Sequence, residues 1–131
     1  MSQPEAGVPL PDEARSALGQ LLDVHLAATR RLARAIRAAD PERRSKRPDE
    51  ALWCCAAIAA GALRGEPVTH KDLVALADGR LSSATLSRAV QDAVLIGMLR
   101  QEALPGNRRV KRLILTEAGW RMLAEGAAAR G

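Results

Sequence analysis

The sequence contains no phenylalanine and no tyrosine, and Trp53 and Trp120 are its only aromatic residues. A platform that stacks the bases of single-stranded nucleic acid needs several aromatic faces, and so does a cage for a cationic ligand. Histidine is limited to His25 and His70, and no Cys/His group has the spacing of zinc ligands. Because no acid–base pair or activated nucleophile stands out either, we expect no metal, no cofactor and no enzymatic activity.

Long apolar segments are absent as well. The longest apolar run, from Leu52 to Leu63, has twelve residues, whereas a helix that spans a bilayer needs about 20. The first residues also lack the basic cluster and the following apolar stretch of a secretory signal. We therefore expect a cytoplasmic protein that does not contact a membrane.

Cysteine occurs only at the adjacent positions Cys54 and Cys55, inside that apolar run. Neighbouring side chains of a helix point about 100° apart, so these two thiols do not readily bridge each other. A thiol in apolar surroundings behaves as a small hydrophobic group, and the prediction is core packing. The alternative is a redox sensor, which needs an exposed thiol of lowered pKa.

Positive charge is present in excess and is localised. The 131 residues include 20 Lys and Arg against 15 Asp and Glu, which gives a net charge of +5. Seven of these cations and two of these acids lie between Arg80 and Arg112, so that segment carries +5 and the remainder sums to zero. Such localisation favours an anionic partner, and nucleic acid above all.

The apolar pattern divides the chain into five segments. Residues 1–11 contain three prolines and are expected to form a disordered arm. Residues 12–39 are predicted to form one amphipathic helix about 42 Å long. Residues 40–49 are predicted to be a solvated basic linker, residues 50–125 a folded domain, and residues 126–131 a frayed tail.

The long helix carries more apolar surface than the domain beside it needs. Its apolar residues recur at spacings of three and four, which places them on one face. We therefore expect a homodimer, and the alternative is that this face folds back on its own domain. The expected dimer interface consists of Leu18, Leu21, Leu22, His25, Leu32 and Ile36.

Two short capped helices and a hairpin follow one another later in the chain. The run Thr69-His70-Lys71-Asp72 fits a capping box at the start of the first helix, and Leu81-Ser82-Ser83 opens the second. Pro105-Gly106-Asn107 is the predicted turn between extended segments Leu99–Leu104 and Val110–Leu115. This order predicts a mainly α fold: a winged helix-turn-helix, with three core helices, a β-hairpin wing and the long N-terminal dimerisation helix.

The second short helix offers small polar groups and one arginine on its outer face, which suits the major groove of DNA. The candidate base-reading residues are Ser83, Ser87, Arg88 and Gln91. The candidate contacts to the DNA backbone are Thr69, His70, Lys71, Arg108, Arg109, Lys111 and Arg112. Base contacts supply specificity and phosphate contacts supply position, so these residues predict sequence-specific binding to double-stranded DNA.

The same region resembles a known family. The motifs are Thr69-x-Lys-Asp-Leu73, Leu81-Ser-x-x-Thr85-x-Ser-Arg88-x-Val90, Gly97-x-Leu99 and Arg108-Arg-x-x-Arg-Leu-x-Leu-Thr-x-Ala-Gly119. Over about residues 50–125 they are similar to the winged-helix core of the MarR regulators. The resemblance implies a dimeric transcription regulator, and many family members respond to small phenolic compounds or oxidants. The hairpin is shorter than the family's wing and lacks its Asp-x-Arg.

The sequence therefore predicts a transcriptional regulator, most simply a repressor, whose partners are double-stranded DNA and a second copy of itself. Two alternatives stay open. One is a winged helix that docks on another regulator or on polymerase as a protein-interaction module. The other is a sensor that releases DNA in response to a small-molecule effector or an oxidant. Trp120 is expected to be a core residue.

Overall fold

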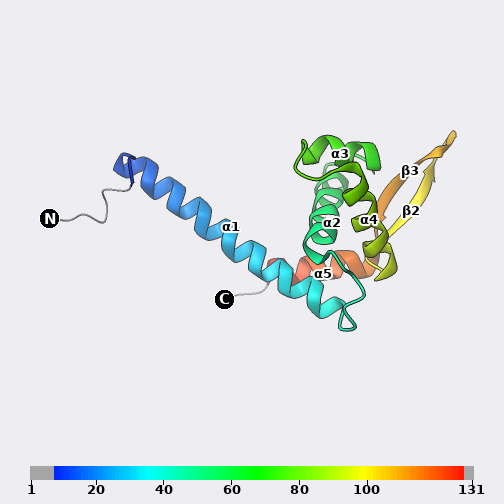
Figure 1. Ribbon diagram of the computed structural model, residues 1–131, viewed down its shortest axis with the longest axis horizontal. Coiled ribbons are helices and arrows are strands. Elements are labelled where there is room, and N and C mark those ends of the chain that lie inside the picture. The colour runs from blue at the N-terminus through cyan, green and yellow to red at the C-terminus, as the bar shows by residue number, and fades with distance from the viewer. Residues whose placement is uncertain (1–7, 129–131) are drawn as a thin grey trace.

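The computed structural model describes residues 8–128, which form five helices and a three-stranded antiparallel sheet (Figure 1). The elements are α1 (Asp12–Ala39), α2 (Pro48–Leu63), β1 (Val68–Thr69), α3 (His70–Ala77), α4 (Ser83–Leu95), β2 (Leu99–Leu104), β3 (Asn107–Leu115) and α5 (Glu117–Ala128). The mainly helical class is confirmed, and the element order is compatible with a winged helix. Within this range, no helix is both long and apolar enough to cross a membrane. The first seven residues of the predicted arm and the last three of the predicted tail lie outside it.

Helix α2 lies at the centre of the core, as its composition predicts. It is apolar on nearly every side, and seven of its 16 residues are buried. Leu73 of α3, Leu86 of α4 and Leu115 of β3 belong to the same buried cluster. A helix without a polar face has to be enclosed by its neighbours, and α1, α3, α4, α5, β1 and β3 all contact α2.

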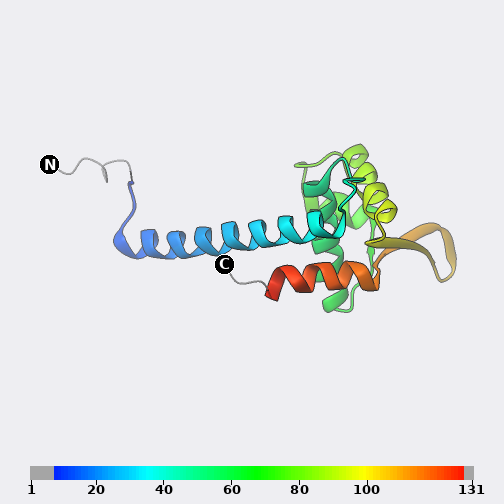
Figure 2. The same ribbon diagram turned by 90° about the horizontal axis from the view of Figure 1, so that it is seen from below.

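Helix α1 is divided into a packed half and a projecting half. Its C-terminal half runs beside α5 (Figure 2). Ile36 is only 1% exposed, and Leu32 packs against the same core. This corrects the prediction that Leu32 and Ile36 form the dimer interface, because both complete the core of their own chain.

Helix α5 also corrects the predicted tail, because it continues through Gly126 to Ala128. Gly126 is buried against α1, where an added Cβ would lie 2.7 Å from Cδ2 of Leu32. The lack of a side chain therefore lets the two helices approach closely. The small residues after residue 125 predict a frayed tail, but Gly126 instead allows α5 to pack closely against α1.

The segment between α1 and α2 is an anchored loop and not a solvated linker, which corrects the prediction for residues 40–49. Asp40 is buried, and its carboxylate accepts hydrogen bonds from the backbone N–H groups of Arg44 and Ser45, each at 2.9 Å. Asp92 of α4 accepts a hydrogen bond from the N–H of Lys46 at 3.1 Å. The loop and the end of α1 therefore belong to the same folded unit as the rest of the chain.

The predicted helix boundaries around α3 and α4 are confirmed. Thr69 and Asp72 form a capping box, in which Oδ2 of Asp72 accepts from the N–H of Thr69 at 2.8 Å. The hydroxyl of Ser82 accepts from the N–H of Thr85 at 3.0 Å at the start of α4. Helix α3 ends at Asp78, which adopts a left-handed conformation with φ of 49°. These local hydrogen bonds fix where the two helices begin, as the capping pattern predicts.

The sheet has the order β1-β3-β2, and its smallest strand was not predicted. In β1, Val68 pairs with Leu113 of β3. The hairpin turn consists of Pro105 and Gly106, whose φ of 81° suits glycine. Strand β3 therefore begins at Asn107, three residues before the predicted start.

Trp120 corrects another expectation, because 37% of its surface is exposed. Met122 of α5 is buried instead, at 2% exposure. Residues two positions apart point about 200° apart on a helix, so only one of the two can face the core.

Both cysteines are core residues, as predicted. Cys54 and Cys55 are 0% exposed. Burial raises the pKa of the Cys54 thiol to about 12, with a smaller contribution from the negative charge of Glu50. Burial also raises the pKa of the Cys55 thiol to about 12, with a smaller contribution from Cys54. The reactive thiolate is therefore strongly disfavoured in the folded chain.

This burial predicts that the folded protein is inert toward thiol reagents. At pH 8 a thiol of pKa about 12 is ionised in roughly one molecule in 10⁴, so a chromogenic disulfide reagent should not label Cys54 or Cys55 within minutes. The same reagent should titrate both thiols after unfolding in guanidinium chloride. Rapid labelling of the native protein would show that α2 is not enclosed as described.

Two glycines in helices predict opposite effects on stability. An added Cβ at Gly119 would overlap the carbonyl oxygen of Met98, whereas nothing lies within 4 Å of a Cβ at Gly19. We expect Gly119→Ala to lower the free energy of unfolding by about 1–3 kcal/mol through overpacking. Gly19→Ala should raise it by up to about 1 kcal/mol through helix propensity. Urea unfolding measures both, and equal effects would contradict the close packing of α5 on the backbone of Met98, the residue before β2.

Candidate nucleic-acid interface

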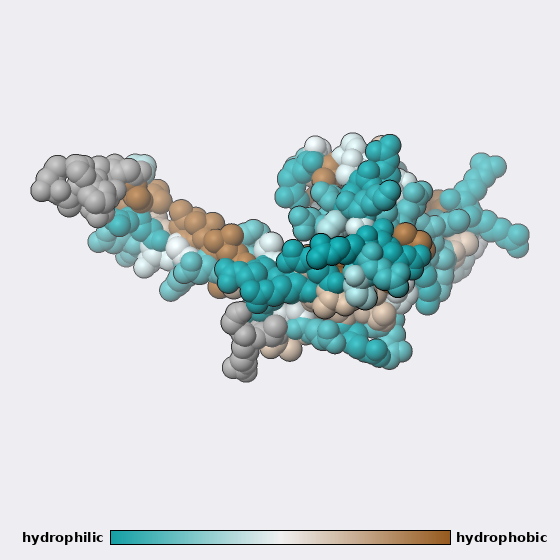
Figure 3. Space-filling view, turned by 60° about the horizontal axis from the view of Figure 1, so that its bottom comes forward, coloured by the Kyte–Doolittle hydropathy of each residue, from teal (hydrophilic) through white to brown (hydrophobic). Residues whose placement is uncertain are grey.

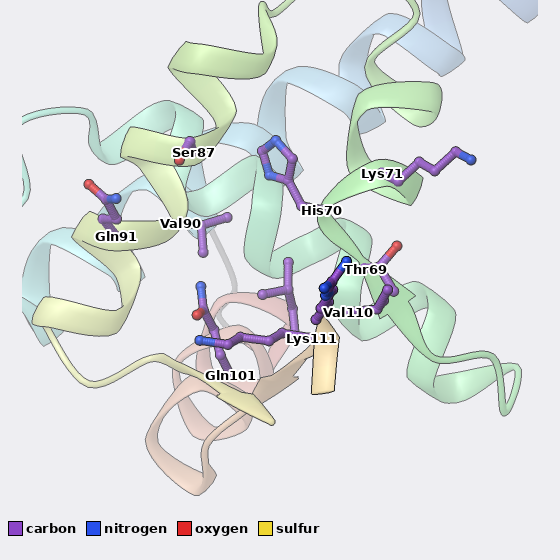
Figure 4. Close-up of a pocket in the computed structure, with 11 residues that line it drawn as sticks. Thr69, His70, Lys71, Ser87, Val90, Gln91, Gln101, Val110 and Lys111 are labelled. Carbon is purple, nitrogen blue, oxygen red and sulfur yellow. The ribbon is translucent and has the colours of Figure 1, made fainter. Parts of the chain in front are cut away.

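A cleft of about 420 Å³ opens between the start of α3, the outer face of α4 and the β2–β3 hairpin (Figure 4). It is lined by Thr69, His70, Lys71, Ser87, Val90, Gln91, Gln101, Arg109, Val110, Lys111 and Leu113. No acid is among these lining residues, while one lysine comes from α3 and two further cations come from β3. The cleft is therefore a concave surface of one charge sign, which concentrates anions.

Strand β1 explains why the start of α3 faces the hairpin. Val68 and Thr69 pair with Leu113 and Arg112 of β3, and α3 begins at the next residue. The capping box then turns the chain from strand into helix within one residue. His70 and the lysine after it are thereby held at the base of the hairpin, where both line the cleft.

Helix α4 separates its apolar and polar residues by face. Leu86 and Val90 are buried against the core, and Ser87 and Gln91 line the cleft. Arg88 is exposed on the outer face of the helix and does not line the cleft. Residues at spacings of three and four share a helix face, so the predicted base-reading residues project outward together from α4.

A hydrogen bond joins the starts of α3 and α4. Nε2 of His70 lies 3.1 Å from Oγ of Ser83, and both side chains are at least partly exposed. The imidazole donates or accepts in this contact according to its tautomer. The sequence assigns these two residues to separate tasks, phosphate contact and base reading, but the structure brings them together. Ser83 itself is held by His70 and does not line the cleft.

The hairpin is irregular where its cations lie. Ala103 pairs with Lys111, but the next residue of β2, Leu104, pairs with Asn107, so residues 108–110 form a bulge in β3. The side-chain Oδ1 of Asn107 accepts a hydrogen bond from the N–H of Arg109 at 3.1 Å within this bulge. Bulges redirect side chains relative to a regular strand, and here Arg109 and Lys111 both face the cleft.

Arg112, a predicted backbone contact, does not line this cleft. Its guanidinium donates a hydrogen bond to Glu102 of β2 at 3.1 Å. Adjacent strand residues point to opposite faces, and Arg112 lines a second hollow, with Ile58 and Trp120, on the other side of the sheet. The run of basic residues alone does not reveal which face each cation takes.

The seven cations between residues 80 and 112 therefore fall into two groups. Arg100 and Arg112 both pair with Glu102, and the guanidinium of Arg80 lies 5.9 Å from the centre of the Trp53 ring. The remaining cations are exposed and make no ion pair within residues 8–128: Arg88, Arg108, Arg109 and Lys111. The unpaired charges are thus those of α4 and the hairpin end.

Gln101 is the polar lining residue that sequence reasoning missed. It pairs with Leu113 in the sheet and shares a face with Leu99 by the two-residue period of a strand. The two-residue alternation is visible in the sequence, but the sequence does not show which face of β2 lines the cleft, because that depends on how the sheet packs against α4. An amide at this position adds a donor group and an acceptor group to the floor of the cleft.

Comparisons with known proteins identify no family. A scan against protein-family models found no match, and a search of curated proteins found no significant match. The likeness to MarR regulators therefore rests on the residue motifs and stays a prediction. Within the part of the chain that the structure describes, no group of three or more His, Cys, Asp or Glu side chains could hold a metal ion.

Proposed function

We propose that this protein is a winged-helix regulator that binds double-stranded DNA with sequence specificity, most simply as a transcriptional repressor. The observation that carries the proposal is the cleft between α3, α4 and the hairpin, which gathers cations from two elements and has no acid among its lining residues. Positive charge concentrated on one face is the electrostatic signature of a nucleic-acid surface.

Helix α4 has the properties of an element that reads the major groove. Its polar outer face carries Ser87, Arg88 and Gln91, and none of the three forms an ion pair or a side-chain hydrogen bond within the described residues. The groove is about 12 Å wide and admits one helix. An arginine there can donate two hydrogen bonds to guanine, and a glutamine can form two with adenine.

The surrounding cations suit the phosphate backbone on either side of that groove. Lys71 lies at the start of α3, and Arg109 and Lys111 lie on the hairpin, so α4 is flanked by positive charge from two elements. Phosphate contacts of this kind fix the register of a recognition helix without reading sequence.

Two of the alternatives, the protein-interaction module and the thiol redox sensor, receive less support from the same structure, whereas a small-molecule effector stays open. Within the described residues, none of the large exposed hydrophobic side chains lines the cleft, so the surface offers little to the apolar centre of a protein interface. A redox sensor needs an accessible thiol of low pKa, whereas both cysteines are buried and have a raised pKa.

The first test compares two arginines of β3. Arg109→Ala should weaken binding to every duplex and reduce the slope of log affinity against log salt by about 0.9 per lost phosphate contact. Arg112→Ala is the matched control, because this cation pairs with Glu102 on the opposite face. Fluorescence anisotropy over a range of salt concentrations measures both. Equal losses for the two variants would show that DNA does not occupy the cleft.

The second test separates specificity from charge at Arg88. Loss of a bidentate contact to guanine should cost roughly 1–3 kcal/mol per half-site on a preferred sequence and much less on random DNA. Arg88→Lys is the control that keeps the charge but not the two-pronged geometry. We expect both Arg88→Ala and Arg88→Lys to lose discrimination in competition titrations. If the lysine variant discriminates as well as the parent does, Arg88 contacts phosphate and the assigned reading face is wrong.

A further inference from the structure

Exposed apolar side chains concentrate on the projecting half of α1. Of the twelve large hydrophobic residues that are exposed in residues 8–128, seven lie between Val8 and Leu26. Those on α1 are Leu18, Leu21, Leu22, Val24 and Leu26, with exposures between 42% and 65%. Figure 3 shows a strip of hydrophobic surface along this part of the helix. Contiguous apolar surface of this kind marks an interaction site.

Exposed apolar residues such as Leu18 and Leu22 belong to an apolar stripe along α1, and the C-terminal part of this stripe packs in the chain's own core. At 3.6 residues per turn, Leu18, Leu22, His25, Leu32 and Ile36 fall within about 80° of one another around α1. The chain covers the stripe from Leu32 onward, where α5 lies against it. N-terminal to Leu32, α1 projects from the folded unit (Figure 2), and the large apolar side chains of the stripe are exposed there.

We infer that this uncovered face pairs with the same face of a second copy, in an antiparallel arrangement centred between Leu21 and Leu22. The fold disfavours a parallel partner. In each chain, the folded unit already covers the stripe at Leu32 and Ile36. If the two helices were parallel, both folded units would lie at the same level between them and would compete for the same space. Antiparallel helices place the folded units at opposite ends of the pair.

The ends of the uncovered face, at residues 12 and 31, define the centre of this arrangement. An antiparallel pair centred between Leu21 and Leu22 places Leu18 level with His25. It also places Asp12, where α1 begins, level with Arg31 of the second copy. The partner helix therefore begins next to the point, at residue 32, where the chain's own folded unit begins to cover the stripe.

The charges along α1 favour the same orientation. Asp12 and Glu13 lie at the start of the helix, and Arg30 and Arg31 lie where it enters the folded unit. Within the described residues Glu13 and both arginines form no ion pair. At 100° per residue these four side chains lie about 120–140° around α1 from the centre of the apolar stripe, so they face away from the partner and contribute only through long-range attraction. An antiparallel pair also opposes the two helix dipoles, whereas a parallel pair aligns them.

The same segment is poorly suited to an anionic occupant. Residues 12–31 contain three acids, Asp12, Glu13 and Asp23, and three arginines, Arg15, Arg30 and Arg31, so their net charge is 3 − 3 = 0 and the segment has no excess of positive charge. Amphipathic helices that lie on anionic membranes carry lysine and arginine on the polar face. A protein face of matching pattern fits better, and the chain supplies one.

The pairing also sets how far apart the two basic clefts lie. From its centre to Ile36 is about 14 residues, or about 21 Å, so the two folded units are joined to the helix pair at points about 42 Å apart. A two-fold pair would present the clefts to two half-sites of a pseudo-palindromic duplex. Only this last consequence rests on the proposed DNA binding.

Single-cysteine variants test the orientation directly. All the positions used are exposed on α1, and the native Cys54 and Cys55 are buried and serve as an internal control. In an antiparallel pair, residue 22 lies beside its own copy, so Leu22→Cys should form a disulfide-linked dimer on mild oxidation. Residue 18 lies about 10 Å along the axis from its own copy, beyond the reach of a disulfide. Leu18→Cys and His25→Cys should therefore cross-link when mixed and not when alone.

Self-cross-linking of Leu18→Cys and of His25→Cys would show a parallel pair and overturn the inference. Light scattering supplies the second measurement. The parent should be a dimer at tens of micromolar, Leu21→Glu should be a monomer of unchanged helix content, and Leu63→Glu, at an exposed apolar residue of α2, should stay a dimer. A monomeric parent would also overturn the inference. A cross-linked dimer that binds no DNA would leave the pairing standing and defeat the proposed function instead.

Discussion

The enclosure of α2 holds the remaining elements in place. This helix has no polar face, and six of the other seven elements contact it. Helix α4 and strand β3 both contact it, and Leu86, Ala89 and Leu115 belong to the same buried cluster as its apolar residues. The walls of the cleft come from α3, α4 and the hairpin, which also contact one another directly. Strand β1 pairs with β3 just before α3 begins, and a hydrogen bond joins His70 and Ser83. Their mutual position therefore depends both on packing around α2 and on these direct links.

The fold that the sequence predicts is correct where the signal is local. Capping residues such as Thr69 and Ser82 fix helix starts through hydrogen bonds three residues away, and the Pro-Gly pair fixes the hairpin turn. The predictions that failed depend on distant contacts. Whether Ile36 faces a second copy or its own core is decided by α5, which begins about 80 residues later in the chain. Likewise the sequence around Asp40 is typical of a solvated acid, and only the closed loop buries it.

The candidate site shows the same division. Its residues were found by charge and by helix period, and most of them meet in one cleft. Arg112 does not line the cleft because it alternates with Lys111 in the regular part of β3 and so lies on the opposite face of the strand. Gln101 was missed because a sheet face cannot be assigned before the packing partner is known. Sequence patterns thus identify which side chains a surface can use, while tertiary packing selects among them.

Our central proposal is that the basic cleft and the outer face of α4 read a specific DNA sequence. In vitro selection from a pool of randomised duplexes tests it most directly, because the operator does not have to be known beforehand. With the full chain at physiological salt, we predict enrichment of one motif that depends on the outer face of α4. Retention of duplexes without any enriched motif over successive rounds, or no retention at all, would contradict it.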